Sequence, residues 1–225
     1  MSETLQWRVA VGGDATTAVF EPAIGRGEAV FVCAHGAGGH RDDRGMQRLA
    51  EVLRSRGFGM VRFNFLYREK GLNRPDAMPR LKACMAAVVE RARAECDGVP
   101  LLIGGRSMGG RTSSMLAADG LACDALLLLA YPLHPAGKPE QLRDAHLPRI
   151  HVPVLCFNGT RDPLCRRDLM EPTLATVKTP WEMHWLEGAD HAFRVLKTSG
   201  RTDAEVLEEI GDASGRWLVG LRASR

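Results

Sequence analysis

Short apolar runs recur along the chain, and between them lie segments whose apolar residues follow a helical period. Most of the runs are continuously apolar rather than alternating, which is typical of strands buried on both faces of a parallel sheet. Their alternation with helices predicts a doubly wound α/β sheet that is mostly parallel. The runs are Ala29–Ala34, Phe58–Phe63, Val99–Ile103, Ala125–Ala130, Val154–Phe157 and Glu182–Leu186.

Four helices are expected, because apolar side chains three and four residues apart form one helix face, as Met46, Leu49 and Leu53 do. They are a helix after Asp42-Asp43 that ends at Gly57, one after Asp76, one from Ser107 through Leu116, and one that begins at the capping-box pair Thr202 and Glu205.

The first forty residues have a different pattern. Gln6–Val11 and Thr16–Phe20 flank Gly12-Gly13-Asp14, which predicts an antiparallel hairpin. No repeat, linker or low-complexity segment divides the rest, so we expect a single domain over residues 1–225. The longest irregular piece, Leu133–Arg149, is too short for a lid domain but long enough to form one wall of a pocket.

Composition narrows the class of protein. Hydrophobic residues make up 45 % and charged residues 25 % of the 225, so the chain can bury a sizeable core. The net charge is +3 and the arginines are scattered rather than gathered in one run, which does not indicate a nucleic-acid partner. The longest apolar stretch, Ala125–Leu133, is far too short to cross a bilayer, so no membrane partner is expected.

The six cysteines bear on the compartment. Three of them, Cys33, Cys123 and Cys156, lie in or beside runs expected to be buried. The polar start Met1–Thr4 lacks the basic and then apolar segments of a signal peptide. We therefore expect reduced thiols and a cytoplasmic protein. No Cys-x-x-Cys pair occurs, so no zinc site is expected.

The candidate nucleophile lies between an expected strand and an expected helix. Gly105, Ser107 and Gly109 match the pattern Gly-x-Ser-x-Gly, in which a strained turn projects the serine hydroxyl at a helix N-terminus. Only very small side chains fit two residues to either side of that serine. A glycine-rich turn without chemistry has the same pattern, but a phosphate loop is disfavoured because no Lys-Ser/Thr follows the glycines.

An oxyanion hole is expected from two backbone N–H groups. One belongs to Met108, which follows the nucleophile, and the other to Ala37 in the loop after an earlier strand. The small residues of that loop let the backbone approach a substrate closely. His35, at the start of the loop, is expected to brace it by hydrogen bonding rather than to do chemistry.

The base must follow the acid and the serine along the chain. His191 does so, in a loop directly after the last expected strand, where its imidazole can lie over the nucleophile. Asp162 follows the preceding strand, and Pro163 stiffens its loop. The expected roles are general base for His191 and orienting acid for Asp162. Asp190 is the alternative acid, although the residue next to His191 is poorly placed to reach its ring.

Taken together, these stretches resemble the α/β-hydrolase superfamily. More narrowly, they are similar to the small bacterial dienelactone-hydrolase-like group, which is related to an animal testis-expressed protein and to the hydrolase-like domain of a histone-acetyltransferase complex. The likeness covers roughly residues 28–220. The motifs that carry it are His35-Gly36-Ala37-Gly38, Gly104–Gly110, Tyr131-Pro132-Leu133-His134-Pro135, Gly159-Thr160-Arg161-Asp162 and Gly188-Ala189-Asp190-His191.

The resemblance implies an α/β-hydrolase fold with no cap domain and no metal, and we expect no cofactor. Dienelactone hydrolases proper use a cysteine nucleophile where this chain has Ser107. The resemblance does not imply a substrate.

The candidate substrate-binding residues are Arg106, His35, Gly38 and Tyr131. Several arginines lie on loops expected to follow strands, at the edge where active sites of such sheets open. They suggest a mildly cationic mouth that favours an anionic ester or thioester, although solvated surface arginines are the alternative. These arginines are Arg41, Arg44, Arg68, Arg161, Arg166 and Arg167.

The function expected from the sequence is a serine esterase that cleaves a carboxylic ester or thioester of a small molecule through an acyl-enzyme. A non-catalytic interaction module with the same fold is one alternative, and an acyltransferase or peptidase with the same triad is another. The protein is expected to be a monomer or a homodimer.

Overall fold

Eight strands form one sheet in the computed structural model, which describes residues 3–223. Their order across the sheet is β1-β2-β4-β3-β5-β6-β7-β8. The strands from β4 to β8 run parallel, as the continuous apolar runs predict, while β1 and β2 are antiparallel. The bounds are β1 Leu5–Val11, β2 Asp14–Glu21, β3 Ala29–Ala34, β4 Phe58–Phe63, β5 Leu101–Arg106, β6 Ala125–Leu129, β7 Val154–Gly159 and β8 Trp181–Leu186.

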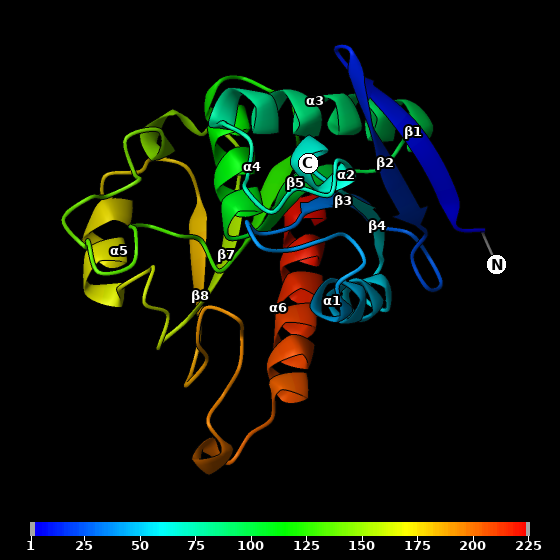
Figure 1. Cartoon of the computed structure of the whole chain (residues 1–225). Helices are drawn as coiled ribbons and strands as arrows, with labels where there is room; N and C mark the ends of the chain where they lie inside the picture. Colours follow the sequence, from blue (N-terminus) through cyan, green and yellow to red (C-terminus); the bar gives the residue numbers. More distant parts are fainter. Residues whose placement is uncertain (1–2, 224–225) are drawn as a thin grey trace.

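Helices cover both faces of the sheet (Figure 1). On one face lie α3 and α4, and on the other lie α1 and α6, which contact each other. The bounds are α1 Arg44–Arg54, α2 Leu66–Glu69, α3 Met78–Glu95, α4 Met108–Ala118, α5 Arg167–Leu174 and α6 Asp203–Ala223, with 3₁₀ turns at Leu147–Arg149 and Lys197–Ser199. This confirms the doubly wound sheet and the four helices expected from the sequence.

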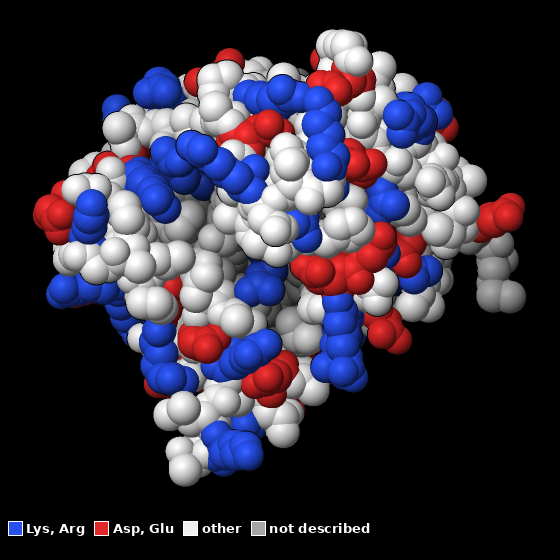
Figure 2. Space-filling view, viewed as in Figure 1, with Lys and Arg blue, Asp and Glu red and all other residues white. Residues whose placement is uncertain are grey.

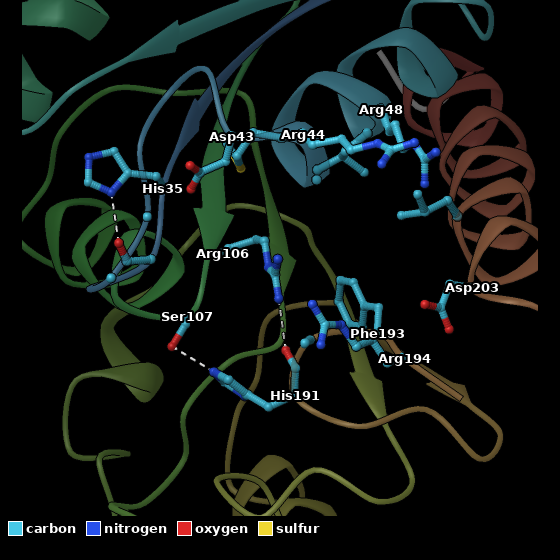
Figure 3. A pocket seen from close by; sticks show the side chains of 18 of the residues that line it. His35, Asp43, Arg44, Arg48, Arg106, Ser107, His191, Phe193, Arg194 and Asp203 are labelled. Carbon is cyan, nitrogen blue, oxygen red and sulfur yellow. Dashed lines mark hydrogen bonds between the residues drawn. The ribbon is translucent and has the colours of Figure 1, made fainter. Parts of the chain in front are cut away.

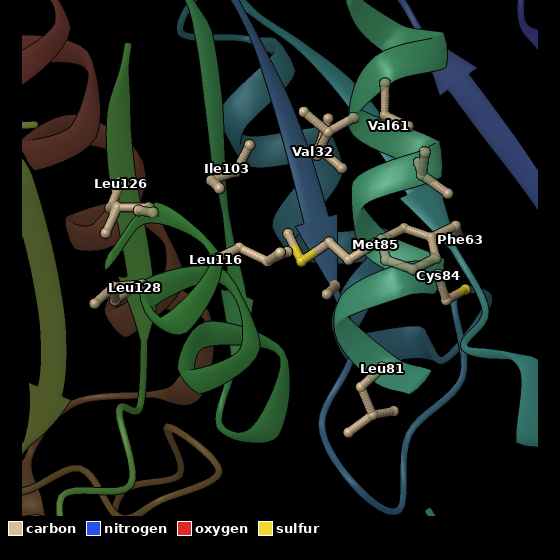
Figure 4. Packing of buried hydrophobic residues seen from close by; sticks show 14 of the residues in the cluster. Val32, Val61, Phe63, Leu81, Cys84, Met85, Ile103, Leu116, Leu126 and Leu128 are labelled. Atoms are coloured by element: carbon tan, nitrogen blue, oxygen red, sulfur yellow. The ribbon is translucent and has the colours of Figure 1, made fainter. Parts of the chain in front are cut away.

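Two apolar clusters, one on each face, hold these layers together. On the face of α3 and α4, Met85 and Leu116 reach from the two helices toward strand residues such as Val32 and Ile103 (Figure 4). All four are buried, Leu116 least completely. Burying an aliphatic side chain of this size contributes about 1.5–3 kcal/mol each. The strands are thereby fixed in register, which fixes where their carboxyl ends and the following loops lie.

The antiparallel hairpin at the N-terminus is confirmed. β1 and β2 turn at Gly12 and Gly13, and β2 also pairs with β4, so the hairpin extends the sheet on one side. Gly12 has φ +59°, the left-handed conformation that such two-residue turns require. The loop 133–149 carries a short 3₁₀ turn at its end, and no cap domain is evident within residues 3–223. Residues 1, 2, 224 and 225 of the expected domain lie outside the described residues.

The largest difference from the expected strand boundaries is in β5, while the other boundaries differ by one or two residues. The sequence predicts a strand over Val99–Ile103, but β5 runs from Leu101 to Arg106. Pro100 has no N–H to donate, which delays the start of the strand. The strand then continues through Gly104 and Gly105, because these glycines pair with β3 and β6 rather than forming the turn itself.

All six cysteines are free thiols, and no helix among residues 3–223 is long and apolar enough to cross a membrane.

Candidate active site

Ser107 stands on a strained turn between β5 and α4. Its φ of +48° and ψ of −110° lie in a backbone region that residues other than glycine rarely adopt. Its N–H donates to the Leu129 carbonyl at 2.8 Å. A Cβ on Gly105 would lie 2.1 Å from the Ala34 carbonyl oxygen, and one on Gly109 would lie 2.5 Å from it. Both glycines are therefore required by the close approach of β3, as the motif predicts.

His191 lies beside this serine. Its Nε2 is 2.9 Å from Ser107 Oγ, and the two side chains point toward each other across the head of β5 (Figure 3). The loop that carries His191 is held by Asp190, whose Oδ1 accepts the N–H groups of Ala192 and Arg194 at 2.8 and 2.9 Å. Asp190, the alternative acid, is thus engaged with its own loop rather than with the imidazole.

Asp162 lies on the other side of the His191 ring. Its Oδ2 and Oδ1 are 2.8 and 3.0 Å from His191 Nδ1, and its side chain is completely buried. Two further donors fix this carboxylate: the Leu164 N–H at 2.8 Å and the Asn158 amide at 3.1 Å. Because Nδ1–H donates to the carboxylate, Nε2 is left to accept the hydroxyl proton. The arrangement can therefore move a proton from Ser107 to His191.

Five other histidines have a described partner elsewhere. The His184 ring contacts the Glu209 carboxylate at 2.8 Å, and His146 Nε2 contacts Ser114 Oγ at 2.8 Å. His134 Nδ1 contacts the Pro135 carbonyl at 3.0 Å, and His40 Nε2 contacts the Asn64 amide nitrogen at 2.8 Å. The fifth is His35, whose ring contacts the Gly36 carbonyl and the Phe65 N–H. None of these five contacts Ser107.

The two residues expected to form an oxyanion hole are near the nucleophile: Met108 follows it directly, and Ala37 lines the same cavity as Ser107. Met108 is the first residue of α4, and Ala37 lies in the turn closed by the bond from Gly39 N to Gly36 O at 3.0 Å. Tyr67 donates its hydroxyl to the Ala37 carbonyl at 2.6 Å, which holds that peptide in place. Within residues 3–223 neither N–H donates to a protein group, so both are free to bind an oxygen.

His35 is buried under this loop. The Phe65 N–H donates to its Nε2 at 3.2 Å, so Nδ1 carries the proton that is donated to the Gly36 carbonyl at 2.7 Å. Burial lowers the pKa of His35 to about 4, and the ring is neutral near pH 7. These contacts match the expected brace. They leave the ring no free nitrogen for the alternative role of binding substrate.

The prediction that Tyr131 contacts substrate is wrong. Its side chain is fully buried, and its hydroxyl donates to the Arg143 carbonyl at 2.8 Å. Its backbone N–H and carbonyl instead contact the amide of Asn158 at 3.2 and 3.1 Å. Tyr131 therefore packs in the core cluster of the α3 and α4 face and does not line the cavity. The phenol ring can be buried there because its hydroxyl has a hydrogen-bond partner in the protein.

A cavity of about 760 Å³ opens beside Ser107. Three of the four predicted substrate contacts, His35, Gly38 and Arg106, line it together with His191. Apolar side chains such as Met46 and Leu207 form part of its wall. The space-filling view shows a hollow near the middle of this face with basic side chains in and around it (Figure 2).

Of the six loop arginines expected at the mouth, only Arg44 lines this cavity. The others make protein contacts outside it. Arg166 pairs with Asp168, and Arg167 pairs with Glu171. The remaining three, Arg41, Arg68 and Arg161, donate to backbone or side-chain oxygens. The cationic lining comes instead from Arg44, Arg48, Arg106 and Arg194.

The sequence reasoning missed two kinds of residue. Asn158 positions Asp162, and its place at the end of β7, four residues before the acid, is the signal that points to it. Arg48 and Arg194 reach the cavity from α1 and from the His191 loop. Nothing in their local sequence distinguishes them from surface arginines. Among residues 3–223, no group of three His, Cys, Asp or Glu side chains is arranged to hold a metal ion.

Comparison with known proteins identifies the architecture. The family model of the α/β hydrolase domain matches residues 27–219. A solved α/β serine hydrolase homologue from Coxiella burnetii has a TM-score of 0.77 and 19 % identity, with 97 % of this chain and 99 % of that chain covered. A dienelactone hydrolase from Anabaena variabilis has a TM-score of 0.74 and 19 % identity, with 97 % of each chain covered.

A third structure, an α/β serine hydrolase without a lid from Xanthomonas campestris, has a TM-score of 0.75 and 20 % identity over 96 % of both chains. At these identities the likeness establishes the fold. The expected kinship with the testis-expressed protein and the histone-acetyltransferase domain stays a prediction.

Proposed function

Because the chain belongs to the α/β-hydrolase family, we propose that it is a serine hydrolase that cleaves a carboxylic ester or thioester through an acyl-enzyme on Ser107. The observation that carries the proposal is the unbroken hydrogen-bonded line from Ser107 Oγ through the His191 ring to the Asp162 carboxylate, at 2.9 and 2.8 Å. A glycine-rich turn without chemistry has no reason to hold a buried carboxylate behind a histidine in this way.

In the proposed reaction, Ser107 Oγ attacks the carbonyl carbon while its proton passes to His191 Nε2. The negative oxygen that develops is bound by the free N–H groups of Ala37 and Met108, and the N-terminus of α4 adds its dipole. The bond to the alcohol or thiol then breaks, and that leaving group takes the proton from His191. Asp162 stabilises the imidazolium formed in between.

Water completes the cycle in the second half. It attacks the acyl carbon, gives its proton to His191, and Ser107 recovers a proton as the acid leaves. Removing one oxyanion donor in enzymes of this type lowers kcat about 10²–10³-fold. We expect a loss of that size for each of the two N–H groups.

The test is labelling with a fluorophosphonate probe, read by intact mass. We expect one phosphonyl adduct on the wild-type protein and none on Ser107→Ala. A neutral ester, p-nitrophenyl butyrate, should release p-nitrophenolate with the wild type only. Absence of labelling in a folded wild-type protein would favour the non-catalytic module. Product partition to an added alcohol instead of water would favour acyl transfer.

A further inference from the structure

Arg106 is a cation that the protein itself does not neutralise. Its side chain leaves β5, lines the cavity beside Ser107 and donates from Nη2 to the His191 carbonyl at 3.0 Å (Figure 3). Its guanidinium lies over the Phe193 ring, with 5.4 Å from Cζ to the ring centroid. Burial lowers the pKa of Arg106 below its ordinary value. A partly buried guanidinium without a carboxylate partner loses hydration that an anion could replace.

The N-terminus of α1 faces the same place. A Cβ on Gly45, in the first turn, would lie 3.8 Å from Arg106 Nη1. This turn has no acidic side chain, and Asp43 at its start makes no capping bond, because its Oδ2 accepts the His40 N–H at 2.7 Å. The positive end of the helix dipole is therefore open to the cavity and adds to the guanidinium charge.

The carboxylates nearest to Arg106 are already engaged. Asp190 and Asp43 both act on it electrostatically, yet neither forms an ion pair with it. Asp203, the other carboxylate on the lining, accepts the Val195 N–H at 2.9 Å. In the part of the chain that the structure describes, none of the four lining arginines forms an ion pair. Because only two aspartates, Asp43 and Asp203, line the cavity with them, it holds more positive than negative charge.

We infer that Arg106 and the N-terminus of α1 form an anion subsite, so that the preferred substrates are esters or thioesters that carry a second, ionised carboxylate near the scissile bond. This inference rests on the proposed function. The planar guanidinium fork matches a carboxylate. The bond from Arg106 to the His191 carbonyl keeps the guanidinium close to the base, which limits the spacer between the two groups of the substrate to a few atoms.

Two substrate pairs locate the carboxylate. The p-nitrophenyl half-ester of glutaric acid and its neutral glutaramic counterpart place the charge on the acyl side. The pair 4-acetoxybenzoate and 4-acetoxybenzamide places it on the alcohol side. We expect wild-type kcat/KM to favour the charged member of one pair by roughly tenfold to a hundredfold, as for a charge-assisted hydrogen bond in a cavity.

The variant Arg106→Met should bring that ratio to about one, and Arg106→Lys should keep part of it. Arg166→Met is the matched control, because it removes the same charge from a residue that pairs with Asp168 outside the cavity, and its ratio should equal that of the wild type. If Arg106 served only to hold His191, both members of a pair would slow equally and the ratio would persist. A persistent ratio in Arg106→Met, or a wild-type ratio of one for both pairs, overturns the inference.

Calorimetry on Ser107→Ala gives the same comparison without hydrolysis. The charged member of the favoured pair should bind at least tenfold more tightly than the neutral one, and this preference should vanish in Ser107→Ala combined with Arg106→Met. Equal binding of both members contradicts the subsite. Selective binding in a wild-type protein that hydrolyses no ester contradicts the proposed function and leaves the subsite standing.

Discussion

Two arginines, the buried Arg62 on β4 and the partly buried Arg106 at the end of β5, have opposite surroundings. Arg62 on β4 has only 6 % of its side chain exposed, and its Nε and Nη2 donate to Glu21 Oε2 at 2.9 and 2.7 Å. Asp42 lies 3.5 Å away, and the Arg41 carbonyl accepts a further bond. Arg106 has a backbone carbonyl and an aromatic ring as neighbours but no carboxylate in an ion pair.

The difference separates charges that stabilise the fold from charges reserved for a ligand. Around Arg62 the protein supplies both members of the ion pair, so the free energy gained belongs to folding. Around Arg106 it supplies one member, so the gain is realised only when an anion binds. Substitutions in the first region should therefore change stability, and those in the second should change activity.

The largest expected effect is on activity. Replacing the acid in Asp162→Asn puts an amide where the carboxylate accepts the Nδ1 proton, which favours the wrong imidazole tautomer. We expect kcat/KM for p-nitrophenyl butyrate to fall by about 10³–10⁴, as loss of such an acid does in serine hydrolases. Asp190→Asn, which alters the carboxylate next to the histidine, is the control and should cost far less. Equal losses of kcat/KM in the two variants would contradict the assignment of Asp162 as the acid.

The next effect is on stability and sharpens the comparison directly. Glu21→Gln removes the nearer carboxylate of Arg62 and leaves only Asp42 at 3.5 Å. It should lower the free energy of unfolding by about 2 kcal/mol, less than for a fully buried pair because Glu21 is 18 % exposed. Arg106→Met should not lower it, because it removes an uncompensated charge. Denaturant unfolding of both variants measures this. A clear destabilisation by Arg106→Met would remove the distinction between the two regions.

A smaller effect concerns Asn158, whose amide donates to the Asp162 carboxylate. Asn158→Leu should lower kcat about tenfold with KM unchanged, because the carboxylate loses one of the groups that orient it. Measured well below the unfolding temperature, the rate of fluorophosphonate labelling should fall in parallel. A change in KM alone would show that Asn158 acts on the cavity rather than on Asp162.

The smallest effect is a pH dependence. His35 lies beside the cavity but resembles Arg62 in having all its partners within the protein. Its pKa is about 4 when folded and about 6.5 when unfolded, so the unfolded chain binds more protons between these values. Stability is complete above pH 6.5 and falls as the pH drops toward 4. Between pH 7.5 and 5.5 the loss due to this ring is about 1 kcal/mol.

The variant His35→Gln should show a shallower loss of stability over that range than the wild type, by urea unfolding at each pH. Some dependence should remain, because burial also lowers the pKa of His146 to about 4. Parallel profiles for wild type and variant would contradict the assignment of a neutral, buried His35.

Most of the fold could be predicted from the sequence because the apolar runs are long and unbroken. Each of the six runs corresponds to a strand, and the hairpin turn carries the glycines that its backbone needs. The two short helices α2 and α5 escaped prediction. The first has only four residues, Leu66–Glu69, and the second contains Pro172, so neither has a clear apolar period.

The site was predictable where chemistry depends on residue type and chain order. The pattern around Ser107, and the positions of Asp162 and His191 after successive strands, placed three side chains at one edge, and the structure brings those side chains into contact. The lining of the cavity was not predictable. Arg48 reaches it because α1 packs over β4, and Tyr131 does not line it because its ring lies in the core.

The tight approach of β3 to the turn around Ser107 has a consequence for how such a protein can change over evolution. Any side chain at position 105 or 109 would collide with the Ala34 backbone, whereas the side chain at 107 projects into open space. The scaffold thus has no room for a side chain at positions 105 and 109, whereas the side chain at position 107 has room in the cavity. One atom of the reacting group, oxygen or sulfur, can be exchanged while the frame around it stays constant.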